Sequence, residues 1–130
     1  MADTDTQPSG HDPLTDRQRQ ILDLLLTVEI AGVAELRQQA RLASARPWDC
    51  GCASVDLWVD RDHAPGSSVP TGLVTQADSK RPDDSVLLGL MLWVTDGWLS
   101  GIEMVEVFDN HDDAPRVFPP PDSFHRVRGG

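Results

Sequence analysis

Residues 85–108 read SVLLGLMLWVTDGWLSGIEMVEVF, two apolar runs joined at Asp96-Gly97. An Asp-Gly pair between β-rich runs is among the strongest short-range signals for a hairpin, because glycine accepts the positive φ that such turns need. The first run is apolar on both faces, which indicates a central strand covered by helices on one side. The second run is out of phase for a regular strand, and a bulge near Gly101 would restore its alternation.

Upstream of the hairpin, the pattern becomes helical. Thr15-Asp16-Arg17-Gln18 is typical of a capping box, in which the Thr15 hydroxyl and the Gln18 side chain each satisfy a backbone amide. Apolar residues then recur at helical spacing and predict a helix over 15–28. A weaker pattern predicts a second helix over Val33–Leu42, with an end blurred by small residues and stopped by Pro47.

Two further strands are expected before the hairpin. Residues 52–60 alternate well and predict a half-buried strand, with Trp58 projecting from its polar face. Residues 69–77 form a weaker candidate, and Pro70 favours an edge position for it. The predicted fold is α+β, with one or two N-terminal helices packed on a four-stranded, mostly antiparallel β-meander.

The domain organisation follows from composition. Residues 1–13 are rich in Asp, Thr, Pro and Gly and are expected to be a disordered lead. Residues 14–122 are expected to form a single domain, and residues 123–130 a loose tail. The 130-residue length fits one domain.

The formal net charge is −10, with 21 acidic and 11 basic residues, and no block of basic residues is present. Nucleic acid and anionic membranes are therefore poor candidates for partners, whereas a basic protein is a reasonable one. The longest apolar run has about nine residues, short of the ~20 that a membrane helix needs. The acidic N-terminus is the reverse of a secretory signal, so we expect a cytoplasmic protein.

A helix-turn-helix regulator of DNA is one alternative, because the segment 14–26 resembles the opening helix of that class. The fold also needs a recognition helix for the major groove. The matching place, residues 44–51, contains Pro47, Gly51 and a single base, and the chain lacks the basic footprint that phosphate binding requires.

Cys50 and Cys52 support a second alternative, a site that depends on a metal or a thiol. In the cytosol both are expected to be thiols. A structural zinc site needs four ligands, normally from two separated pairs, and the chain has no second cysteine pair. We therefore expect two small, partly buried thiols, and no cofactor.

Catalysis has one candidate, Glu103, which lies among apolar neighbours. Burial would raise its pKa and make it a conceivable general acid. Glycosidase-like chemistry would need a second carboxylate across a cleft, which a small sheet covered by helices rarely provides. We expect Glu103 to accept hydrogen bonds from a neighbouring strand or turn, and the protein not to be an enzyme.

Three tryptophans are candidates for a binding face. Trp93 and Trp98 flank the turn and are expected to pair across the hairpin. Trp58 is expected to be exposed on its strand, and exposed tryptophan is enriched at interface hot spots.

The segments 14–26, 35–39, 50–57 and 96–103 together resemble a family of short bacterial proteins that begin with a helix and close with a hairpin. The resemblance covers about residues 14–122 and implies the fold and a bacterial cytosol, but no activity. We expect a non-catalytic protein-binding domain, such as an accessory or immunity-type protein. Its partner would be another protein or a second copy, held through a sheet edge or the tryptophan-bearing face.

Overall fold

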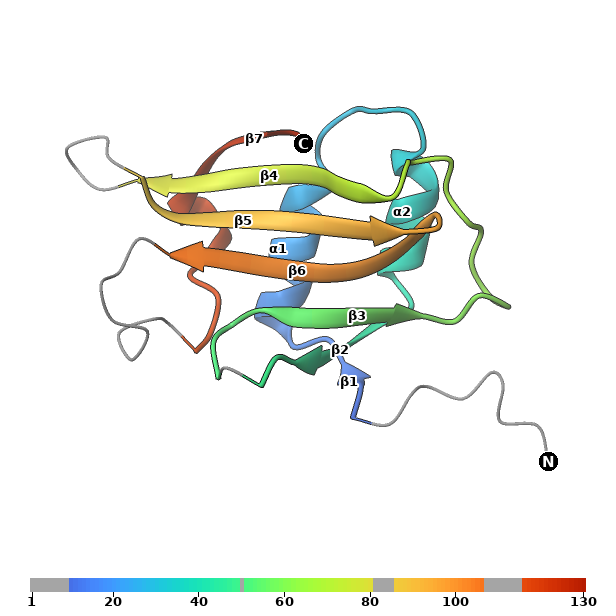
Figure 1. Ribbon diagram of the computed structural model, residues 1–130, viewed down its shortest axis with the longest axis horizontal. Helices are drawn as coiled ribbons and strands as arrows, with labels where there is room; N and C mark the ends of the chain where they lie inside the picture. Colours follow the sequence, from blue (N-terminus) through green and yellow to red (C-terminus); the bar gives the residue numbers. More distant parts are fainter. Residues whose placement is uncertain (1–9, 50, 81–85, 107–115) are drawn as a thin grey trace.

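The computed structural model describes residues 10–49, 51–80, 86–106 and 116–130. Within these ranges two α-helices lie on one side of an antiparallel sheet of seven strands (Figure 1). The α+β class is confirmed, whereas the expected number of four strands is wrong. The elements are β1 (Asp12–Pro13), α1 (Asp16–Leu25), α2 (Val33–Ala40), β2 (Ala43–Pro47), β3 (Val55–Val59), β4 (Gly72–Lys80), β5 (Val86–Thr95), β6 (Trp98–Glu106), the 3₁₀ turn η2 (Pro121–Ser123) and β7 (Phe124–Gly129).

The start of α1 is the predicted capping box. The Thr15 hydroxyl accepts from the Gln18 amide at 3.1 Å, and the Gln18 side chain accepts from the Thr15 amide at 2.9 Å. The helix ends at Leu25, three residues before the predicted end. The carbonyl groups at its end accept hydrogen bonds from residues that follow the helix. The helix can therefore end here without leaving these carbonyl groups unpaired.

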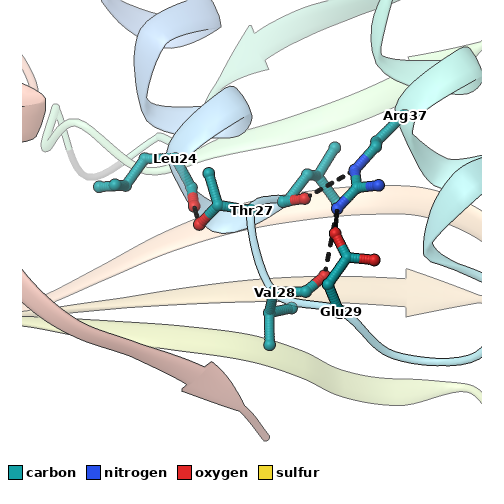
Figure 2. A network of polar contacts seen from close by, with 6 residues as sticks. Leu24, Thr27, Val28, Glu29 and Arg37 are labelled. Carbon is teal, nitrogen blue, oxygen red and sulfur yellow. Dashed lines mark hydrogen bonds and ion pairs between the residues drawn. The ribbon is translucent and has the colours of Figure 1, made fainter.

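One of those partners comes from α2. Figure 2 shows Arg37 reaching the end of α1, where its guanidinium donates to the carbonyls of Leu26 and Val28 at 2.9 and 3.4 Å. The same group pairs with Glu29 at 2.7 Å. A cation at a helix C-terminus offsets the partial negative charge there. Arg37 therefore joins the two helices.

The second helix also ends early, at Ala40, and residues 43–47 form β2 instead of a helix end. β2 pairs with β3 in the register Ala43↔Val59 to Pro47↔Val55. Ala43 and Ala45 are 5% and 4% exposed and face the helices. Their short side chains fill a shallow space beneath the helices, so packing overrides a composition that tolerates either structure.

The sheet is not a meander. Its strand order is β1-β2-β3-β6-β5-β4-β7, in which β3 pairs with β6. Strands β4, β5 and β6 are joined by hairpins, and β3 lies beside the far strand of that group, which is the Greek-key arrangement. The connection 60–71 therefore crosses the tip of the β5–β6 hairpin, and Ser67 donates to the Gly97 carbonyl there at 2.9 Å.

Both ends of the domain extend further than expected. Residues 1–9 lie outside the described residues, but Asp12 and Pro13 form β1 and pair with β2. The expected loose tail contains β7, which pairs with β4. β4 consequently has a strand on each side, and its predicted edge position is wrong. Phe124 in β7 is 5% exposed, so burial of this ring helps to hold the terminal strand in place.

The hairpin has the predicted details. Asp96 and Gly97 have φ of 53° and 88°, the positive values of the expected tight turn. The register moves from Trp93↔Gly101 to Val94↔Leu99, which places the predicted bulge beside Gly101.

A buried glutamine fixes the hairpin tip to α2. The Gln39 side chain is 0% exposed, donates to the carbonyls of Pro65 and Gly97 at 2.9 Å each, and accepts from the Leu99 amide at 2.9 Å. Both the nitrogen and the oxygen of the Gln39 amide group therefore have hydrogen-bond partners. Buried polar groups in proteins are normally paired in this way, because an unpaired one lowers stability. The helix, the crossing connection and the hairpin therefore form one unit.

Candidate interaction surface

The two faces of the sheet differ in what covers them. Both helices lie behind the sheet in the view of Figure 1, and in the described part of the chain no helix lies on the other face. Side chains alternate along each strand, so every second residue points to this open face. On β3, Val55, Leu57 and Val59 are buried toward the helices, whereas Asp56 and Trp58 are half-buried on the open face.

All four tryptophans of the chain lie on this face or at its margin. Trp58 is on β3, and Trp93 lies opposite Gly101 across the β5–β6 pair. Trp98 lies opposite Thr95, which follows the inward-facing Val94. Each of the four indoles is half-buried. We call the following set the tryptophan face: Trp48, Asp56, Trp58, Met91, Trp93, Trp98 and Glu103.

Carboxylates fix the orientation of two of the rings. The Trp48 Nε1–H donates to Asp56 Oδ1 at 3.1 Å, and the Trp93 Nε1–H donates to Glu103 Oε1 at 3.1 Å. Asp56 also lies 4.0 Å from Arg46. Because a hydrogen bond restricts rotation of the ring, these indoles are held in one orientation before any partner arrives.

Gly101 lies opposite Trp93 and close to the backbone of β3. A Cβ atom at this position would lie 3.3 Å from the Val55 carbonyl oxygen, closer than ordinary contact. An aromatic side chain opposite a glycine covers the exposed backbone that the glycine leaves. The predicted direct pairing of Trp93 with Trp98 is wrong, because the two-residue turn places Trp98 opposite Thr95, whereas Trp93, beyond the bulge, lies opposite Gly101.

Two depressions accompany the tryptophans. One, of about 310 Å³, is lined by Arg46, Pro47, Trp48, Asp49 and Asp56. The other, of about 100 Å³, lies between Trp58 and Trp98. At the second depression the guanidinium carbon of Arg61 stands 5.1 Å from the centre of the Trp98 ring, a cation–π distance. The remaining residues that line it are Leu57, Val59, Arg61, Thr95, Leu99 and Ser100.

The helix side has a larger hollow, but its chemistry is structural. It has a volume of about 670 Å³ and is lined by Arg19, Arg37 and Arg41, among others. Arg19 donates to the Ala40 carbonyl at 3.2 Å, and Arg37 serves the end of α1 as described above. The two helices run antiparallel, so Arg19 and Arg37 bond the carbonyl ends of the neighbouring helix at opposite ends of this hollow.

The expected role of Glu103 is confirmed, because it accepts a hydrogen bond from a side chain on the neighbouring strand. The His63–Asp60 pair, 2.7 Å apart in the crossing connection, is the other notable acid–base contact. Hydrogen bonds from the Asp62 backbone amide and then from His63 lower the pKa of Asp60. His63 is exposed and stands outside the two depressions, so we assign no catalytic role to the pair.

The expectation of two thiols is wrong at Cys52, which is disulfide-bonded. Cys50 lies outside the described residues. Between β2 and β3 the chain folds back tightly, with Gly51 at φ 79° and the Trp48 amide donating to the Ser54 carbonyl at 3.1 Å. Among the described residues, no group of three or more His, Cys, Asp or Glu side chains is arranged to hold a metal ion.

Two other predictions concern membranes and DNA. None of the helices in the described ranges is long and apolar enough to cross a membrane. The place where a helix-turn-helix regulator needs its recognition helix is occupied by the strand β2.

Sequence reasoning missed two residues of this surface, Trp48 and Arg61. Trp48 follows a segment predicted to end a helix, so its place beside Asp56 was not visible until β2 and β3 were paired. Arg61 follows the predicted strand 52–60, and only the crossing of the connection 60–71 over the hairpin brings it to Trp98. The alternation Asp56-Leu57-Trp58-Val59-Asp60 was the available signal for the face itself.

No family model, no curated protein and no solved structure matches the chain. The resemblance to short bacterial proteins stays a prediction, and the functional argument rests on the residues of the tryptophan face.

Proposed function

We propose that the protein is a non-catalytic binding module, which docks a basic segment of a partner protein on its tryptophan face. The observation that carries this proposal is the gathering of Trp48, Trp58, Trp93 and Trp98 on the side of the sheet opposite the helices. Tryptophan is the residue type most enriched at interface hot spots, since it buries a large area at a small entropic cost.

The arrangement of the face supports recognition of another chain. Its strands are central members of the sheet, so the backbone beneath the indoles is rigid. Hydrogen bonds to Asp56 and Glu103 hold two of the rings in place. A pre-organised surface loses less conformational entropy on binding than a mobile one does.

Charge favours a basic occupant. The chain carries a net charge of −10, which attracts cations from a distance and raises association rates. Indole faces also attract cations directly, and the guanidinium of Arg61 already stands 5.1 Å from the centre of the Trp98 ring, which supports a cationic occupant. Exposed carboxylates at Asp49, Asp62 and Asp96 lie beyond the strand ends near Trp48 and Trp98.

An NMR titration of the full chain tests the proposal. Each tryptophan contributes one indole N–H signal, so four signals report directly on the face. An acetylated hexapeptide of alternating glycine and arginine is expected to shift these signals saturably, whereas its glycine–glutamate counterpart is not. Shifts confined to α1 and α2, or equal responses to both peptides, would contradict the proposal.

A matched pair of charge variants separates recognition by the face from general attraction. Asp56→Asn retains an oxygen that can accept from Trp48 but removes a carboxylate from the face, and we expect it to weaken peptide binding about threefold. Asp23→Asn makes the same change in net charge on an exposed position of α1 and is expected to have a smaller effect. Equal effects would show that only net charge matters. Sedimentation of the chain alone is the remaining check, because self-association that covers the same indoles would replace the proposed partner with a second copy.

A further inference from the structure

The depression between Trp58 and Trp98 is already shaped around a cation. Its walls are two indoles from different strands, and Thr95 and Ser100 add hydroxyls that bond to each other at 3.1 Å. Arg61, from the crossing connection, stands over one wall. With the Arg61 side chain in place, the depression has a volume of about 100 Å³. Its volume is larger when that side chain moves away.

The surroundings of this depression favour a positive charge. Along β3 and the residue that follows it, Trp58 lies between Asp56 and Asp60, which alternate on the same side of the strand. Among the residues that the structure describes, Arg61 is the one cationic side chain that lines the depression. Aromatic walls with carboxylates nearby are the chemistry that recognises guanidinium and ammonium groups.

The local turn explains why Arg61 is there. The Asp60 carboxylate accepts from the Asp62 backbone amide at 2.9 Å and pairs with His63 at 2.7 Å. These bonds wind residues 60–63 into a turn, with Arg61 between its anchoring residues. The Asp60 carboxylate is thereby occupied by the turn, and the Arg61 guanidinium is left to stack on the indole.

We propose that this depression is a subsite for an arginine side chain of the partner, and that Arg61 occupies it in the unbound protein. The inference rests on the proposed function and specifies the residue type that the tryptophan face recognises. A planar guanidinium stacks on an indole more favourably than a strongly hydrated ammonium does. Binding of the partner then requires Arg61 to swing out, so Arg61 limits the affinity and rejects weak cationic competitors.

Removal of Arg61 tests the inference. The probe is N-acetyl-L-arginine amide, its neutral counterpart is N-acetyl-L-citrulline amide, and the readout is the indole signal of Trp98 in the full chain. We expect Arg61→Ala to bind the arginine compound about two- to fivefold more tightly than the unmodified protein does. Arg41→Ala removes an exposed arginine from the helix side and should leave the affinity unchanged.

The outcomes separate the subsite from the wider function. Unchanged or weaker binding by Arg61→Ala, an equal response to citrulline, or a response that excludes Trp98 would overturn the inference. If the unmodified protein binds the glycine–arginine hexapeptide but Arg61→Ala does not increase the affinity for the arginine compound, the proposed function is retained and the subsite is ruled out. If the hexapeptide does not bind while Arg61→Ala binds the arginine compound at Trp98, the subsite is retained and the proposed function is ruled out.

Discussion

The two faces of the sheet consist of the same strands but differ in the type and the burial of their side chains. Toward the helices, Leu90, Leu92 and Ile102 are 0% exposed and make an aliphatic core. Toward the other side, Met91, Trp93 and Glu103 at the alternate positions are half-buried. Aliphatic side chains stabilise a fold by complete burial, whereas large amphipathic rings left partly in water are typical of surfaces that bind.

The largest expected effect separates two adjacent residues of β5. Leu90→Ala should lower the free energy of unfolding by about 3 kcal/mol, because it leaves a cavity under the helices. Met91→Ala, one residue along on the open face, should cost clearly less, since that side chain already contacts water. Urea unfolding measures both. Equal losses would mean that the open face is packed like a core, which contradicts the comparison.

The second prediction concerns Gln39, which links the helix layer to the hairpin tip. Gln39→Leu should cost about 2 kcal/mol, because the Leu99 amide and two carbonyls lose their partner in a buried place. Hydrogen exchange at the Leu99 amide should accelerate as well. Gln38→Leu, at the exposed neighbouring position, is the control and should stay within about 0.5 kcal/mol. A full effect at position 38, or none at 39, would rule out the link.

On the open face, Glu103 is expected to matter less for stability. Glu103→Ala removes the acceptor of the Trp93 indole and should cost about 1 kcal/mol, whereas Glu103→Gln keeps an acceptor and should cost less. Urea unfolding gives the costs, and the Trp93 indole signal in NMR reports the hydrogen bond. A loss in Glu103→Ala as large as that of Leu90→Ala would show that the two faces contribute alike.

The smallest expected effect is a pH dependence in the crossing connection. The amide of Asp62, followed by His63, lowers the pKa of Asp60 from its ordinary 3.8. A lowered pKa in the folded state gives a stabilisation that is present above the unfolded value and is lost as pH falls through the folded value. Urea midpoints should therefore fall less steeply in Asp60→Asn than in the unmodified protein below about pH 4. An identical decrease of the urea midpoint at acid pH in Asp60→Asn and in the unmodified protein would contradict this account.

Local signals in the sequence predicted local structure well. The Thr15–Gln18 capping box, the Asp96-Gly97 turn and the bulge at Gly101 each depend on a few neighbouring residues, and the structure confirms all three. The strand β7 has no local signal because its pairing partner, β4, is distant in sequence; β2 pairs with the nearby β3, and its difficulty is one of composition. The segment 43–47 is rich in small residues that suit a helix end as well as a strand, and only its pairing with β3 decides between them.

The tryptophan face shows the same limit. The alternation of β3 was sufficient to direct Trp58 outward, because strand periodicity is local. The meeting of Trp58 with Trp98 and Arg61 depends on the Greek-key crossing, which no short pattern encodes. Strand order therefore had to be known before the candidate site could be assembled.

The most direct test of the central claim is the affinity of Trp58→Ala for the arginine–glycine hexapeptide, measured by calorimetry on the full chain. Gln20→Ala, at an exposed position of α1, is its control. The account predicts that Trp58→Ala binds at least about tenfold more weakly, as expected for a hot spot, while its urea midpoint shows that it still folds. Unchanged affinity in a folded Trp58→Ala protein would contradict the claim that this face is the docking surface.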